Sequence, residues 1–433
     1  MGICTNQQTA PMDEKISIKS FSDIPEVLVK SANYEIKQFS NIHSEKPIYI
    51  LKNKTLGSFL LLNEYDYFIW ESIDGINTIS DIYLKFLAKY EKLPYEYIFK
   101  FIQKICYANL IANYKCENIE GKKSILEIKV PIPFFSRFMF FCYQIFGRFL
   151  YNWVFLVVYG LIVSAGILTF FTTLNQAINL SGMSSYLYAF LACIVPVVIH
   201  EVAHAFTCLH YKRTIYDSGF MFYMFMPAFY VNTSDIWMED RRKRFMVSLA
   251  GPMSDVFMGS LFALVYAYYI QSPYIYLISC MSFARGLFNL NPLLKWDGYY
   301  CLMDILDIYN LSSLSKNFIF KIYPQRIHKS KTFALSQKEM LLLIYGVFSQ
   351  LFFIYFISVL IANTFGMFVN IYYGKPVTFT ASLIISIILL ATLLLNLLKY
   401  FIEKMMVFWK IILKKAVETV AKAFKILKIV IFF

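Results

Sequence analysis

The sequence predicts a mainly α-helical, polytopic membrane protein of about six transmembrane helices with a re-entrant hairpin, preceded by a small α+β cytosolic domain. Composition is the first reason: 58% of the 433 residues are hydrophobic and 16% are charged, whereas a soluble domain carries about a quarter of its residues as charges. The second reason is that long apolar runs begin only after residue 150. The third is that Lys and Arg gather in alternate loops. We therefore expect a bilayer to surround most of the apolar side chains.

Six segments have the composition of membrane spans. About 20 apolar residues cross the hydrocarbon core as a helix. The segments that approach this requirement are 151–174, 182–199, 250–271, 273–290, 340–366 and 377–398. Basic residues precede the first span and follow the second, fourth and sixth. Because cytoplasmic loops carry the excess of Lys and Arg, this pattern predicts a multi-pass protein of a bacterial-type plasma membrane with both termini in the cytoplasm.

The chain is expected to have five parts. They are an N-terminal segment that could add a strand (1–44), a winged-helix domain (45–116), a membrane-surface connector (117–149), a membrane domain (150–399) and a cationic amphipathic tail (400–433). Residues 399–433 contain eight Lys against two Glu among apolar residues, which favours a helix on the anionic inner leaflet over a solvated tail. The lipid bilayer is therefore an expected partner, and most of the formal net charge of +13 is an orientation signal.

The segment before the spans has the element order of a winged helix. The expected elements are strands at 47–52 and 57–62 and helices at 63–73, 78–90 and 94–108. Asn63 and Thr78 are placed as N-caps of the first two helices. Residues 41–115 contain nine Lys and eight acidic residues with no Arg, so there is little electrostatic attraction for phosphates. Nucleic acid is not an expected partner.

Residues 60–90 read LLLNEYDYFIWESIDGINTISDIYLKFLAKY, and this segment resembles the PqqD-like peptide-recognition domains. The resemblance lies in an Asn-initiated helix followed by a DG-x-x-T-x-x-[DE]-I turn. It implies that the domain binds the leader of a ribosomally made precursor peptide as an added strand. The alternative is a regulatory cap that binds no peptide.

His200, Glu201 and His204 form an HExxH motif. Residues four apart lie on one face of a helix, so the two imidazoles can bind one metal ion while Glu201 acts on a water molecule. The alternative is a pair of core histidines. It is disfavoured because ionisable side chains at the end of a membrane span oppose insertion by about 2–3 kcal/mol each and are usually retained for function.

A second motif follows in residues 288–298, which read FNLNPLLKWDG and match NxxPxxxxDG at Asn289, Pro292, Asp297 and Gly298. With the HExxH motif on an earlier span, the sequence resembles the site-2 protease family of intramembrane zinc metallopeptidases. Together, in this order and at cytosolic span ends, the two motifs are strongly specific.

The resemblance implies a role for each matched residue. His200, His204 and Asp297 would bind Zn2+, Glu201 would be the general base and then the acid, and Asn289 would donate to the oxyanion. No other cofactor is expected, and no residue is assigned to substrate binding.

Two further features concern the surroundings of this site. Residues 217–237 are apolar and aromatic but too short to cross the membrane twice, which predicts a re-entrant hairpin; the alternative is a membrane-surface loop. Residues 250–255 resemble the family pattern AGPxxN, with Asp255 in place of Asn. Asp255 and Arg285 are expected at similar depth, and we predict that they pair because each alone is a costly buried charge.

The resemblances together imply an intramembrane zinc endopeptidase that cleaves a precursor peptide for leader removal or maturation before export. They also imply a peptide-modifying enzyme or an ABC exporter as partner. One alternative keeps the chemistry but changes the substrate to a membrane-tethered regulator or a signal-peptide remnant. Another is a non-catalytic adaptor that presents a peptide to a transporter, which the intact motifs disfavour.

Overall fold

The structure is a computed structural model of the 433-residue chain. It describes residues 24–41, 44–55, 57–91, 95–114, 127–174, 183–223, 226–323 and 335–372. The chain divides into two compact units, 1–222 with 227–354 and 223–226 with 355–433. The predicted sixth span, 377–398, and the cationic tail lie outside the described residues.

The front domain has a sheet followed by helices, in the predicted order. Its antiparallel sheet has the order β1-β2-β3. The elements are β1 (Tyr34–Asn41), β2 (Ser44–Asn53), β3 (Phe59–Leu62), α1 (Glu64–Ser72), α2 (Ile79–Tyr90) and α3 (Tyr95–Tyr107). β1 is the strand that the N-terminal segment could add. β3 starts two residues later than predicted, after Gly57 at φ 64°. The winged-helix assignment itself stays a prediction.

The two predicted N-caps are confirmed. The Asn63 side chain accepts from the Asp66 amide at 2.9 Å, and the Thr78 hydroxyl accepts from the Asp81 amide at 3.1 Å. Each aspartate also accepts from the amide of its cap residue, which completes two capping boxes. These helices pack a core around the fully buried Phe86.

The membrane domain is built from long helices. They are α6 (Trp153–Thr173), α7 (Met183–His210), α8 (Arg241–Tyr268), α9 (Pro273–Asn289) and α13 (Gln337–Tyr372). Three stretches of the described chain are long and apolar enough to cross a membrane: Trp153–Thr173, Arg241–Tyr268 and Gln337–Phe356. That composition is typical of a membrane protein. α7 and α9 coincide with two further predicted spans, and their crossing stays a prediction.

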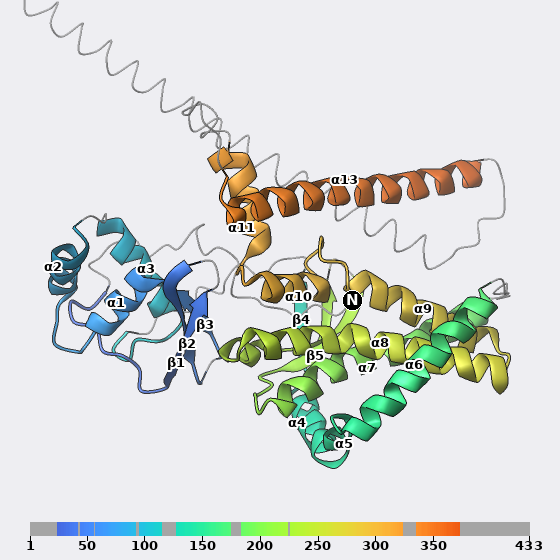
Figure 1. The fold of residues 1–433 in the computed structure, drawn as a ribbon. Helices are drawn as coiled ribbons and strands as arrows, with labels where there is room; N and C mark the ends of the chain where they lie inside the picture. The colour runs from blue at the N-terminus through green and yellow to red at the C-terminus, as the bar shows by residue number, and fades with distance from the viewer. Residues whose placement is uncertain are drawn as a thin grey trace, which may run out of the picture. The chain divides into compact units, whose positions relative to one another are not determined.

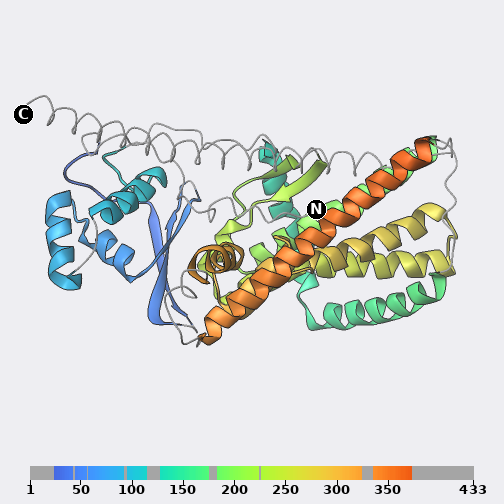
Figure 2. The ribbon, with the colours of Figure 1, turned by 90° about the horizontal axis from the view of Figure 1, so that it is seen from above.

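α8 is the central helix of this domain. It packs against α6, α7 and α9, and both ribbon views show α6, α8 and α9 side by side (Figures 1 and 2). Ten of its residues are buried, including Asp255. By contrast, α6 leaves apolar side chains such as Leu168 and Phe171 exposed, as expected for a helix that faces lipid.

The connector and the segment after α7 form a second small sheet. Its order is β4-β5-β6, with β4 (Glu127–Pro131) from the connector and β5 (Ser218–Tyr223) and β6 (Met226–Val231) from the predicted re-entrant segment. The hairpin is thus present as two strands, whereas the pairing with β4 was not predicted. The 3-10 turn η3 (Ser234–Met238) follows, and the re-entrant position stays a prediction.

Shorter helices complete the fold. In the connector they are α4 (Pro133–Cys142), the π-helical turn η2 (Tyr143–Gly147) and α5 (Arg148–Leu150). After α9 they are α10 (Asp297–Leu306), α11 (Leu311–Asn317) and the π-helical turn η4 (Phe318–Ile322).

A buried ion pair joins the front domain to the segment after α7. Lys52 on β2 donates to Asp235 in η3, and their side chains are only 8% and 3% exposed. Asp235 also accepts from the amide and hydroxyl of Thr214, both at 2.9 Å. Burial alone would lower the pKa of Lys52, but hydrogen bonds to Asp235 and Tyr216 outweigh it and raise the pKa above its ordinary 10.5.

Replacing Lys52 by Met should lower the free energy of unfolding by about 3 kcal/mol, because Asp235 becomes a buried charge without a cationic partner. Thermal or chemical unfolding of the full chain in detergent measures the difference. The raised pKa keeps this contribution complete below pH 10.5 and removes it as the pH rises through the folded value. Lys54→Met is the control because Lys54 is exposed; equal losses in both variants would contradict the pair.

Candidate metal centre

α7 places both histidines of the HExxH motif on one face. His200 and His204 are each 1% exposed, and their Nε2 atoms lie 3.2 Å apart. Glu201, between them in sequence, is 3% exposed. The four-residue spacing in a continuous helix produces this arrangement.

Asp297, the first residue of α10, completes the cluster. Its Oδ2 lies 3.1 Å from His200 Nε2 and 3.5 Å from His204 Nε2. The three ligand atoms lie within 4.8 Å of one another, and all three residues are buried. The structure thus brings the three predicted metal ligands together from two helices.

The chain folds back tightly between α9 and Asp297. A Cβ on Gly298 would lie 2.9 Å from the Leu290 Cα and closer still to its carbonyl, so this position requires glycine. α8 also anchors α10, because Arg244 Nε donates to Asp304 Oδ1 at 2.7 Å and both side chains are 4% exposed. These contacts fix the position of the Asp297 carboxylate.

Outer hydrogen bonds orient the two imidazoles. His200 Nδ1 lies 2.8 Å from Asp255 Oδ2, and His204 Nδ1 lies 2.6 Å from the carbonyl oxygen of Val247. A carbonyl can only accept, so the proton of His204 is on Nδ1, and the Asp255 carboxylate favours the same tautomer at His200. Both Nε2 atoms therefore present lone pairs to the centre of the cluster, as in a metal-binding histidine pair.

The cluster is suited to a divalent cation. Both carboxylate oxygens of Asp297 and Oε1 of Glu201 are buried and have no hydrogen-bond partner among the described residues. Buried oxygens of this kind are costly unless a cation or donor compensates them. Two imidazoles and one carboxylate match a catalytic zinc site with one open position.

The predicted contact between Asp255 and Arg285 is present, but Asp255 has a second partner that the sequence did not suggest. Arg285 donates through Nε at 3.1 Å and through Nη2 to the same carboxylate. Its Nη2 also donates to the Pro196 carbonyl at 2.5 Å. Asp255 thus joins the His200 imidazole to a guanidinium that is itself tied to α7.

Gly251 belongs to the segment that resembles AGPxxN, but its close approach to the histidines was not predicted from the sequence. A Cβ there would lie 2.6 Å from His200 Nε2 and still closer to His204 Nε2, so any side chain would displace the histidines. Val247, Gly251 and Asp255 follow one another at four-residue spacing and share one face of α8. That spacing, read beside HExxH, is the signal that could have placed Val247 and Gly251 against the histidines.

Asn289 ends α9 and is 2% exposed. Its Nδ2 is buried without a hydrogen-bond partner in the described chain. It lies four residues after Arg285 and therefore on the same helix face. A free buried amide is consistent with the predicted oxyanion donor, and this role stays a prediction.

Replacing Asp255 by Asn should lower the metal affinity about 10–100-fold, the usual effect of removing a carboxylate behind a ligating histidine. Competition with a chelator of known affinity measures it in purified protein. Ser260→Ala is the control, because Ser260 lies on α8 but donates to the Val163 carbonyl, away from the histidines. An unchanged affinity for the Asp255 variant would contradict its orienting role.

Comparison with known proteins gives one weak relation. No family model matches the chain, and no solved structure matches it. A Bacillus subtilis (strain 168) protein named "Putative peptide zinc metalloprotease protein YydH" is 26% identical over 146 residues. These residues are 32% of this chain and 58% of that protein, so the chain spans little more than half of the relative's length. The chain is thus similar, at a distance, to a protein named as a zinc metalloprotease.

Proposed function

We propose that the protein is a zinc-dependent intramembrane endopeptidase. The observation that carries this proposal is the buried cluster of His200, His204 and Asp297 with Glu201 beside it. The weak relation to a protein named as a peptide zinc metalloprotease supports the same reaction class. A purely structural role is disfavoured, because burying the Asp297 and Glu201 carboxylate oxygens without hydrogen-bond donors lowers the stability of the fold.

His200, His204 and Asp297 would hold the metal ion. Zinc, when bound, supplies Lewis-acid polarisation of the scissile carbonyl and of a water molecule. Glu201 would accept the proton of the attacking water and deliver it to the leaving amine, since its free oxygen lies in the same buried site. The Nδ2 of Asn289 would donate a hydrogen bond to the oxyanion.

We further propose the predicted topology of six spans with both termini in the cytoplasm of a bacterial-type plasma membrane. α7 and α9 would cross beside α8, against which both pack, and residues 377–398 would form the sixth span. His200 and His204 would then lie toward the cytosolic end of α7, and Asp297 would follow the cytosolic end of α9.

A ribosomally made precursor peptide is the proposed substrate. In the order β1-β2-β3, both β1 and β3 are edge strands of the described sheet, and an extended leader can pair with such an edge. A peptide-modifying enzyme or an ABC exporter would act on the same peptide. The non-catalytic adaptor is disfavoured by the complete set of potential ligands and the buried Glu201.

Glu201→Gln should lower the rate of peptide cleavage about 10²–10⁴-fold, the usual contribution of a general base. It should leave the zinc content unchanged, because Glu201 is not a ligand. His204→Ala should lose both zinc and activity. Candidate precursor peptides are incubated with each purified variant, and products and metal are measured by mass spectrometry. Glu339→Gln, at the start of α13 and far along the chain, is the matched control.

Cleavage at the wild-type rate by Glu201→Gln would exclude Glu201 as the base. Retention of zinc with full activity in Asp297→Ala would exclude Asp297 as the third ligand.

The leader is tested separately on the full chain with a precursor and its leaderless form. If the front domain binds the leader, removing the leader should raise KM roughly tenfold with little change in kcat, because the lost contacts are formed equally in the ground and transition states. An unchanged KM would favour the alternative substrate, a membrane-tethered regulator or a signal-peptide remnant.

A further inference from the structure

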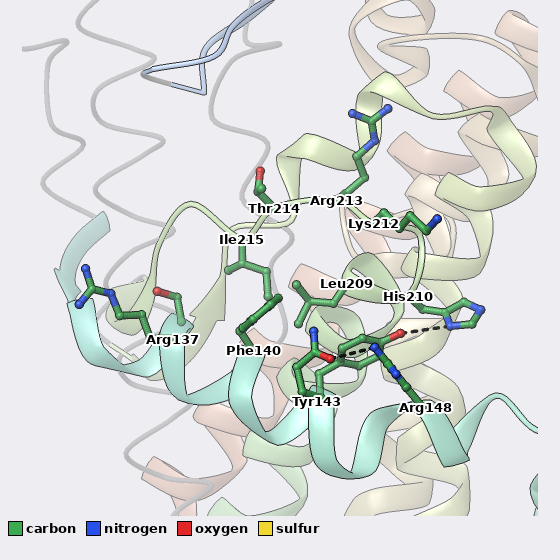
Figure 3. A pocket seen from close by; sticks show the side chains of 12 residues that line it. Arg137, Phe140, Tyr143, Arg148, Leu209, His210, Lys212, Arg213, Thr214 and Ile215 are labelled. Atoms are coloured by element: carbon green, nitrogen blue, oxygen red, sulfur yellow. Dashed lines mark hydrogen bonds between the residues drawn. The ribbon is translucent and has the colours of Figure 1, made fainter.

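A cavity of about 730 Å3, separate from the candidate metal centre, lies between the connector and the end of α7. Its lining residues fall within 136–148, from α4, η2 and α5, and within 209–215, which follow the HExxH motif at the end of α7 and just after it. Figure 3 shows this pocket, which we call the connector pocket. None of the candidate zinc ligands lines it.

The connector pocket is cationic. Arg137, Arg148, Lys212 and Arg213 line it, and no carboxylate does. Arg213 is committed to Glu239, at 2.5 Å. Arg137, Arg148 and Lys212 form no ion pair within the described part of the chain, and Arg148 donates only to the neutral Gln144 side chain, at 3.1 Å. All three are exposed at the cavity, so together they form a cationic surface that attracts an anionic ligand.

Polar groups are also placed at the end of the pocket where Arg148 lies. Tyr143 Oη lies 3.3 Å from His210 Nδ1, and Figure 3 shows Arg148 beside this pair and Arg137 at the opposite end. The π-helical turn Tyr143–Gly147 lies between the two arginines in the chain, and such turns occur frequently at functional sites. The pocket thus offers hydroxyl, imidazole and guanidinium groups together.

The outer face of the connector is apolar. Phe134, Phe141, Phe146 and Phe149 are 61–72% exposed. Aromatic side chains interleaved with arginines are typical of a segment at the membrane–water interface. This composition would place the connector pocket at the level of the lipid headgroups.

An apolar cavity of about 610 Å3 adjoins the connector pocket. It lies among α6, α7 and α8, with walls that include Phe155, Met253 and Phe257. His210 lines both cavities. The Tyr151 ring, which also lines the apolar cavity, stacks on His210 with centroids 4.0 Å apart. An anionic group in one cavity and a hydrocarbon chain in the other could therefore belong to one molecule.

We propose that the two cavities form one binding site for an anionic phospholipid. The phosphate binds between Arg148 and Lys212, with Arg137 at the far end of the pocket, and one acyl chain lies in the apolar cavity beyond His210. The adjoining apolar cavity distinguishes this ligand from free phosphate, and the exposed aromatic residues distinguish it from a soluble acidic peptide. The lipid would bind the face of α7 that carries Ala203, Phe206 and His210, not the face that carries His200 and His204.

The test measures lipids retained by the full-length protein. Protein is reconstituted in nanodiscs of phosphatidylcholine with a minor fraction of phosphatidylglycerol, extracted with mild detergent and examined by native mass spectrometry. We expect one phosphatidylglycerol per chain. The double variant Arg148→Gln/Lys212→Gln should weaken retention roughly tenfold or more, since it removes two of the three cations that would attract the phosphate.

The charge-matched control is Arg241→Gln/Arg242→Gln, at the start of α8 and outside both cavities, which should retain the lipid. A second variant, Leu156→Trp, adds bulk at the wall of the apolar cavity and should also weaken retention, with the cations intact. Elution volume and thermal midpoint identify any variant that fails to fold, and Leu156→Trp then carries the test.

Four results would overturn the proposal. They are equal retention of phosphatidylcholine, equal losses in the control, displacement of the lipid by inorganic phosphate or glycerol 3-phosphate at equal concentration, and displacement by an acidic peptide. The third would identify free phosphate as the ligand and the fourth a peptide. None of these readouts depends on peptidase activity, so failure here leaves the proposed function unaffected.

Discussion

The hydrogen bond between Asp255 and His200 is the contact on which the candidate metal centre depends most. It connects α8 to α7 at the level of the ligands, and Arg285 extends the connection to α9 and to the Pro196 carbonyl. The Asp255 carboxylate and the Arg285 guanidinium neutralise one another in a region where each charge alone would be costly, and the imidazole satisfies a further hydrogen bond of the carboxylate. The same hydrogen bonds orient the His200 imidazole, so the contacts that hold α7, α8 and α9 together also set the geometry of a metal ligand.

The sequence predicted those parts of the fold that local patterns determine. Capping residues such as Asn63 and Thr78 marked helix starts, and both positions are confirmed. Apolar runs located the helices α6, α8 and α13, because hydrocarbon length sets the length of a span. HExxH identified a histidine pair, because the helical period alone brings its members together.

Contacts between residues far apart in the chain could not be predicted from the sequence. The β4 strand pairs with the hairpin although α4, α5, α6 and α7 lie between them in the chain, and Lys52 meets Asp235, which is 183 residues later. Neither pairing leaves a periodic signal, since each depends on how separate elements pack. The contacts of Asp255 were predicted only in part. Its pairing with Arg285 was predicted from the cost of a buried charge. Its contact with His200 could not be predicted without knowing which face of α8 packs against α7.

The pairing of β4 with β5 constrains the order in which the chain can assemble. β4 precedes α6, whereas β5 follows α7, so the pairing of the two strands closes a loop of chain that contains both of these helices. During synthesis, β4 leaves the ribosome early and has no partner until both helices have been made and placed. If α6 and α7 both cross the membrane as proposed, the hydrogen bond from the Ile132 amide to the Ser218 carbonyl, at 2.8 Å, can form only after those helices have returned the chain to the same side. The pairing of β4 with β5 would therefore depend on membrane insertion, because the two strands can meet only when α6 and α7 have been inserted in the correct orientation.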